Sequence, residues 1–143
     1  MRWIVLVGLF CLVTLAACGG PNPDAQQAYQ AFVKQLRAAG ASVVEDQERY
    51  ISDFSGEDHH LTVNAGWVEV YAYPTPAEAN ADAAHLSPDG GTFQRDHSVS
   101  ISDWAIPPHF YKKDRLIVLY VGYDNQIRSL LTRLLGSQFA GGS

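Results

Sequence analysis

Apolar residues recur at helical spacing in two long segments of the chain. From Ala25 to Ala39 they stand three or four positions apart, after Asp24 as a helix N-cap and before Gly40 as a C-cap. Near the C-terminus, isoleucine and leucine residues occupy positions i, i+3, i+4, i+7 and i+8 between Asp124 and Gly136. The spacing predicts a helix in each segment, and the second one is expected to lie on a sheet with its apolar side.

A third helix is predicted from its start signal. Thr75 is placed as the N-cap, Pro76 as the first helical residue, and Glu78 where its side chain reaches back to the cap. The segment SPDGG ends this helix. Its apolar side is expected to consist of small residues that allow a close approach to a sheet, namely Ala77, Ala81 and Ala84.

Strand patterns occupy the segments between these helices. ASVVE predicts a short strand, and HLTVN and WVEVYAY predict a hairpin with its turn at Ala65-Gly66. Residues 92–104 alternate weakly, which predicts one or two strands, and RLIVLYVG predicts a central strand that is buried on both faces. In WVEVYAY, we expect Val68, Val70 and Ala72 to face inward and Trp67, Glu69, Tyr71 and Tyr73 to face outward.

The order of these elements defines the expected fold class. Antiparallel hairpins that alternate with three helices predict an α+β fold, in which the helices pack mainly on one face of an antiparallel sheet and form two layers with it. A ferredoxin-like arrangement is the alternative, although the leading helix and the extra strands fit it imperfectly. We expect residues 25–143 to form a single domain.

The first 17 residues follow a different pattern. A single positive charge at Arg2 precedes an uncharged run over residues 3–15, and two alanines then stand before Cys18. This layout is typical of a secretory signal. The run is too short to be a comfortable membrane span, since a helix needs about 20 residues to cross a hydrocarbon core of roughly 30 Å. We therefore predict a signal peptide over residues 1–17.

The end of this leader, Leu15-Ala16-Ala17-Cys18, resembles the lipobox of bacterial lipoproteins. The resemblance implies that the chain is cut before Cys18 and that a diacylglyceryl group and acyl lipid are joined to this residue. It also implies an extracytoplasmic protein that is anchored to a bacterial membrane, with residues 18–24 as the lipidated tether. A secretory leader that is cut elsewhere is the alternative.

Removal of the leader changes the thiol and charge content of the chain. Cys11 would leave with it, so Cys18 would be the last cysteine and no disulfide framework could form. Loss of Arg2 leaves nine basic residues against 15 acidic ones, a formal charge of -6. Nucleic acid and anionic lipid are poor partners for such a surface.

The rest of the chain carries a weaker resemblance. The segments LRAAGASVVE, VYAYPTPAEANADA and PPHFYKKDRLIVLYVG are similar to small uncharacterised bacterial lipoproteins. This resemblance implies no activity, and we expect no cofactor apart from the covalent lipid on Cys18.

Groups that could carry catalysis or bind a metal are few. The mature chain would keep no free thiol, and it contains neither a GxSxG motif nor a glycine-rich phosphate loop. The weak metal candidates are Asp58, His59 and His60, but the side chains of adjacent residues in a strand point to opposite faces. We therefore predict neither catalytic residues nor a metal site.

Aromatic residues cluster in DWAIPPHFY and in the predicted hairpin. Tryptophan and tyrosine are enriched in recognition surfaces. The candidate binding surface therefore comprises Trp104, His109, Phe110, Tyr111, Trp67 and Tyr71. The alternative is that Trp104, Phe110 and Tyr111 close one end of the core.

Three functions remain open at this point. The leading hypothesis is a non-enzymatic, lipid-anchored domain of the cell envelope that binds a partner protein or a small ligand through residues 104–111. The second is a small metal-dependent or hydrolytic envelope enzyme that uses Asp58, His59, His60 or Asp103. The third is a structural component of the envelope.

Overall fold

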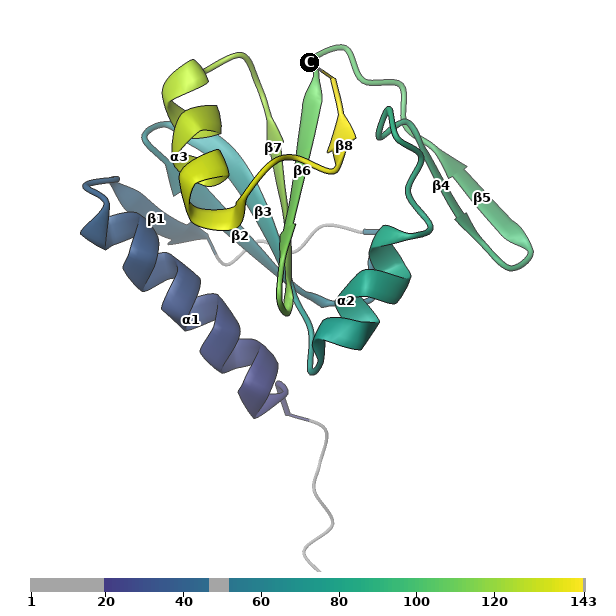
Figure 1. Ribbon diagram of the computed structural model, residues 1–143, viewed down its shortest axis with the longest axis horizontal. Coiled ribbons are helices and arrows are strands. Elements are labelled where there is room, and N and C mark those ends of the chain that lie inside the picture. Colours follow the sequence, from purple (N-terminus) through teal and green to yellow (C-terminus); the bar gives the residue numbers. More distant parts are fainter. Residues whose placement is uncertain (1–19, 47–51, 143) are drawn as a thin grey trace, which may run out of the picture.

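The computed structural model describes residues 20–46 and 52–142 (Figure 1). The predicted leader with Cys18 lies outside the described residues. The α+β class is confirmed by the elements, which are α1 (Pro23–Ala38), β1 (Val43–Asp46), β2 (Glu57–Val63), β3 (Gly66–Ala72), α2 (Pro76–Ala83), β4 (Thr92–Arg95), β5 (Ser98–Ile101), β6 (Pro108–Lys113), β7 (Leu116–Val121), α3 (Asn125–Leu135) and β8 (Ala140–Gly141).

The strands of the described part form two antiparallel sheets. The larger has the order β1-β2-β3-β7-β6-β8, and β4 and β5 form a separate hairpin. β7 lies inside the larger sheet and its first five residues are buried, which confirms the predicted central strand. The β2–β3 turn lies at Asn64-Ala65, one position earlier than expected. Both residues have positive φ, 49° and 69°, as a two-residue hairpin turn of this twist requires.

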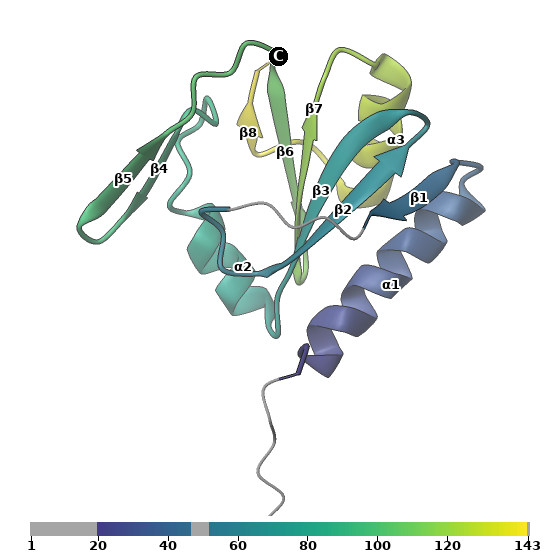
Figure 2. The same ribbon diagram turned by 180° about the vertical axis from the view of Figure 1, so that it is seen from behind.

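Both faces of the larger sheet are covered (Figures 1 and 2). α1 and α3 pack on one face in a cluster that includes Val70 and Val118. α2 packs on the opposite face in a cluster that includes Tyr71, Ile117 and Leu119. Successive side chains of a strand enter opposite cores, so β3 and β7 are buried on both sides. The structure therefore differs from the expected two layers, because one of the three helices lies on the other face.

The second core also changes the expected orientation of β3. Val68, Val70 and Ala72 are fully buried, as predicted for the inward face. Tyr71 and Tyr73, which were expected to face outward, are buried as well. They contact the cluster that contains Ala79 and Ala83 of α2. The prediction was wrong for these two tyrosines because it assumed that only one face of the sheet is covered.

The predicted N-cap is wrong for α1 and is confirmed for α2. α1 begins at Pro23 and is capped by Asn22, whose Oδ1 accepts hydrogen bonds from the backbone N–H groups of Asp24 at 3.0 Å and Ala25 at 3.2 Å. Proline is well tolerated at the first helical position, so α1 extends into the predicted tether and Asp24 is not the cap. Thr75 caps α2 as predicted, since its Oγ1 accepts from the N–H of Glu78 at 3.2 Å.

The buried side of α2 differs from the prediction. Ala77, Ala81 and Ala84 are exposed. The buried residues are Ala79, Asp82 and Ala83. Alanine occurs on both sides of this short helix, so its spacing did not show which side is buried. The buried side also contains the carboxylate of Asp82, which a search for apolar positions does not find.

The cap of α3 provides the first test of this fold. Asp124 Oδ1 accepts from the N–H of Gln126 at 2.7 Å and from that of Ile127 at 3.4 Å. We expect Asp124→Ala to lower the free energy of unfolding by about 1 kcal/mol, since two helical N–H groups lose their acceptor. Urea denaturation measures the change, with Asp124→Asn as the capping control. Equal midpoints for the two variants would contradict the assignment of the cap.

Candidate functional site

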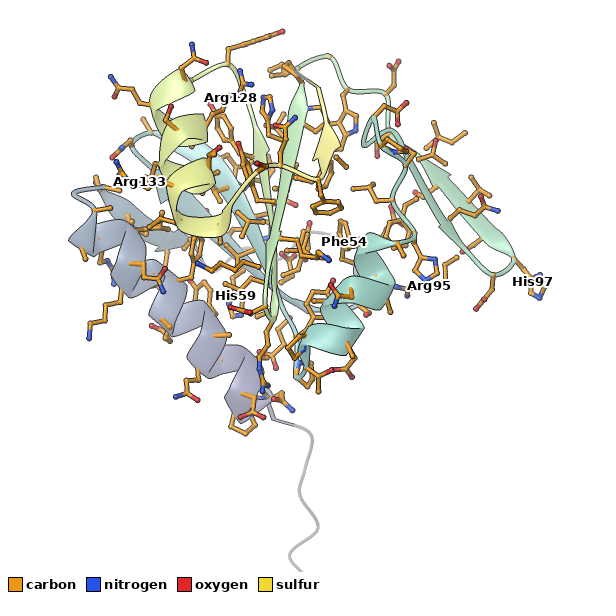
Figure 3. The ribbon with its side chains drawn as sticks, viewed as in Figure 1. Phe54, His59, Arg95, His97, Arg128 and Arg133 are labelled. Carbon is orange, nitrogen blue, oxygen red and sulfur yellow. The ribbon has the colours of Figure 1, made fainter. Side chains whose placement is uncertain are left out.

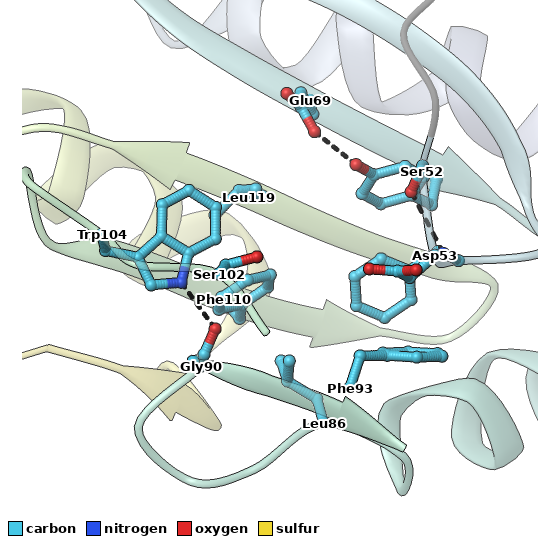
Figure 4. A pocket seen from close by; sticks show the side chains of 13 residues that line it. Ser52, Asp53, Glu69, Leu86, Gly90, Phe93, Ser102, Trp104, Phe110 and Leu119 are labelled. Carbon is cyan, nitrogen blue, oxygen red and sulfur yellow. Dashed lines mark hydrogen bonds between the residues drawn. The ribbon is translucent and has the colours of Figure 1, made fainter. Parts of the chain in front are cut away.

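A cavity of about 180 Å³ opens on the α2 side of the larger sheet (Figure 4). Its floor is formed by side chains of three neighbouring strands, namely Glu69, Tyr71, Leu119 and Phe110. Its walls come from residues 52–54, from the segment between α2 and β4, and from the segment that follows β5. The cavity therefore lies between the sheet and the β4–β5 hairpin.

Aromatic rings form much of the wall. The centroids of Phe54 and Phe93 are 5.1 Å apart with an interplanar angle of 72°, and those of Trp104 and Phe110 are 6.3 Å apart at 73°. Phe54 also lies 4.8 Å from the ring of Tyr71. Edge-to-face contacts of this kind are favourable and fix the rings relative to one another. The wall is thus a mutually packed aromatic cluster.

Trp104 is fixed by its polar atom as well as by packing. Its indole Nε1–H donates to the carbonyl oxygen of Gly90 at 2.7 Å (Figure 4). Gly90 has a φ of 73°, and a Cβ at this position would lie 2.7 Å from the Phe110 ring. Only glycine fits this position without strain. The turn at Gly90 therefore sets the position of the tryptophan in the wall.

Glu69 and Tyr71 form the polar end of the cavity. The Tyr71 hydroxyl donates a hydrogen bond to Glu69 Oε2. Burial raises the pKa of the Glu69 carboxyl above its usual value, and the hydrogen bond from Tyr71 opposes this rise. Burial also raises the pKa of Tyr71, and the neighbouring Glu69 adds to that effect. The tyrosine therefore remains the proton donor of the pair.

A row of hydrogen-bonded polar side chains on β2 and β3 lies beside this pair. The strand register places His60 opposite Glu69 and Asp58 opposite Tyr71. The Trp67 indole N–H donates to His60 Nδ1 at 3.2 Å, and His60 Nε2 lies 3.0 Å from Asp58 Oδ2. Because Nδ1 accepts a hydrogen bond, the ring proton is on Nε2 and is donated to Asp58.

The three predicted metal candidates do not come together. His59 lies on the α1 side of the sheet, where its ring stacks on Tyr29 with a centroid distance of 3.7 Å (Figure 3). His60 and Asp58 lie on the opposite side, as the alternation of a strand requires. Within residues 20–46 and 52–142, no group of three or more His, Cys, Asp or Glu residues could hold a metal ion.

The structure divides the predicted binding surface into two parts. Tyr71, Trp104 and Phe110 line the cavity. Trp67 is 47% exposed and is bonded to His60.

The two remaining members of the predicted surface are buried elsewhere, so their assignment to a surface was wrong. Tyr111 packs in the core beneath α1 and α3. His109 is 1% exposed, with Nδ1 3.0 Å from Gln138 Oε1 and Nε2 3.1 Å from the Gly122 carbonyl oxygen. Successive residues of β6 alternate between the faces, so only Phe110 of this run reaches the cavity.

Asp82 is a residue that sequence reasoning missed. Its buried Oδ2 accepts from the Ser55 N–H at 2.7 Å, the Ser55 hydroxyl at 2.7 Å and the Tyr73 hydroxyl at 2.9 Å. Its Oδ1 forms an ion pair with Arg95 of β4. Burial alone would raise the pKa of this carboxyl, but the donors from Ser55 and Tyr73 together with Arg95 hold it below its usual value. Asp82 thus joins α2 to the two segments that carry Phe54 and Phe93.

Comparisons with known proteins identified no relative of this chain. No protein-family model, curated protein or solved structure matches the chain. In the described part of the chain, no helix has the length and apolar character that a membrane span needs.

Proposed function

We propose that this chain is a lipid-anchored protein of the bacterial cell envelope whose domain binds a small ligand in the cavity described above. The observation that supports binding is the aromatic-walled cavity with a few polar groups at one end. Small-molecule sites have this composition. A cavity of about 150 Å³ is large enough for a benzene ring. The cavity here, of about 180 Å³, therefore suits a ligand with one ring-sized apolar part.

The proposal of a lipid anchor is based on the leader sequence, and the short segment between Cys18 and α1 is compatible with it. Asn22 caps α1 and is four residues beyond Cys18. A chain spans at most about 3.6 Å per residue, so the distance between the lipidated residue and the start of α1 cannot exceed roughly 15 Å. The domain is then held close to the membrane, and its function there is to bind a ligand rather than to transform it.

Blocking the cavity tests the binding function. Ser102 lines the cavity and is exposed, so Ser102→Trp places a large side chain there with little effect on the core. We expect benzyl alcohol to shift the amide NMR signals of cavity residues in the wild-type protein, and its affinity to fall at least tenfold in Ser102→Trp. Ser137→Trp is the matched control, because Ser137 is also exposed but does not line this cavity. Equal affinity in the two variants would place the binding site elsewhere.

A further inference from the structure

The charged groups around the cavity indicate the kind of ligand. Among the described residues, its lining contains two carboxylates, Glu69 and Asp53, and no lysine, arginine or histidine. We infer that the ligand is a cationic amine, with an ammonium group at the Glu69 end and a ring-sized apolar body against the aromatic wall. This inference rests on the proposed function and adds the ligand class to it.

Glu69 is the group that an ammonium would contact. It is a partly buried carboxylate whose hydrogen bond comes from a neutral donor, the Tyr71 hydroxyl. Glu69 takes part in none of the ion pairs of the described residues. A desolvated carboxylate is stabilised by an opposite charge within about 4–6 Å. A bound ammonium would supply that charge from the cavity.

Among the described residues, the neighbours of Glu69 form no ion pair with it. His60 faces it from β2, but its Nδ1 accepts from Trp67 and its Nε2 lies beside Asp58. His60 attracts the Glu69 carboxylate and lowers its pKa, but among the described residues its ring forms an ion pair with Asp58 and not with Glu69. Asp58 adds a further negative charge on the same face of the sheet. An anionic ligand would be repelled by this set of groups.

The aromatic wall also favours a cation. Ammonium groups are attracted to the faces of tryptophan, tyrosine and phenylalanine rings, by about 0.5–2 kcal/mol depending on desolvation. Arg95 lies over one ring of the wall, with its guanidinium carbon 5.4 Å from the centroid of Phe93. Arg95 is paired with Asp82 and does not line the cavity. No lysine or arginine of the described residues thus occupies the ring-lined space beside Glu69, where we place the external cation.

Three matched probes test the charge preference: benzylammonium, benzyl alcohol and benzoate, titrated by calorimetry into the purified full chain at pH 7.5. We expect benzylammonium to bind at least tenfold more tightly than the alcohol and benzoate to bind more weakly than both. In Glu69→Gln the preference for the amine should fall to within about threefold. Glu78→Gln is the matched control, because Glu78 lies in the exposed capping box of α2, which also accepts glutamine.

A pH titration of the wild-type protein provides a second measurement that needs no variant. Protonation of Glu69 removes its charge, so the preference for benzylammonium over benzyl alcohol should decrease on acidification. Equal affinities for all three probes, or tighter binding of benzoate, would overturn the inferred ligand class and leave the binding function standing. If none of the probes binds, the proposed binding function is itself overturned.

Discussion

Replacement of Asp82 by alanine is expected to lower the free energy of unfolding by about 3 kcal/mol, a large share of the 5–15 kcal/mol that is typical of a domain. The substitution removes the acceptor of three hydrogen bonds and the partner of Arg95. It leaves the Ser55 N–H and the buried Tyr73 hydroxyl without an acceptor. Thermal unfolding should show a decrease in Tm of about 10 °C.

Asp103→Ala is the matched control for this experiment. Asp103 is exposed, so its loss should change stability by no more than about 0.5 kcal/mol. A double-mutant cycle with Tyr73→Phe isolates the contribution of one hydrogen bond, and a coupling of about 1 kcal/mol is expected. If Asp82→Ala and Asp103→Ala unfold at the same temperature, the role of Asp82 in joining these segments is refuted.

The stabilisation by Asp82 should also depend on pH. Its pKa is held below the usual value in the folded protein, whereas the unfolded chain titrates near 3.9. The charged form therefore stabilises the fold fully above about pH 5, and this contribution is lost as the pH falls through the folded pKa. The difference in stability between the wild-type protein and Asp82→Asn should shrink on acidification from pH 7 to pH 3.

The contacts of Asp82 explain why part of the site escapes sequence analysis. Its partners Ser55 and Arg95 lie 27 and 13 residues away along the chain. On a short alanine-rich helix, a buried aspartate has the same appearance in the sequence as a solvated one. Only the folded chain brings these segments together, so neither Asp82 nor the aromatic wall built from Phe54 and Phe93 could be predicted.

Local signals, in contrast, predicted much of the fold. The leucine spacing and the Asp124 cap predicted α3, and the apolar run predicted the central position of β7, because both patterns depend on neighbouring residues. Strand alternation also separated His59 from His60 correctly. It misplaced Tyr71, because alternation shows which residues share a face but does not show whether that face is covered by another element.

Substitution of Cys18 by serine is expected to abolish lipid attachment completely. A serine hydroxyl cannot form the thioether that the lipobox resemblance implies, since the thiolate is the nucleophile in that chemistry. Buried methylene groups contribute about 0.8 kcal/mol each, and stable anchoring takes more than one acyl chain. The wild-type protein should therefore remain with washed membranes. Its intact mass should equal that of residues 18–143 plus lipid, whereas Cys18→Ser should lack the lipid mass.

Cys11→Ser is the matched control for the lipid anchor, because it changes the other cysteine of the chain, which lies within the predicted leader. This variant should have the same lipidated mature mass and the same membrane fraction as the wild-type protein. A wild-type protein with an unmodified Cys18 and an intact leader would overturn the proposed location. The ligand cavity would be unaffected by that result, since the described residues that line it all belong to the folded domain beyond Asn22. The anchor and the binding site are therefore separate claims, and each can fail without the other.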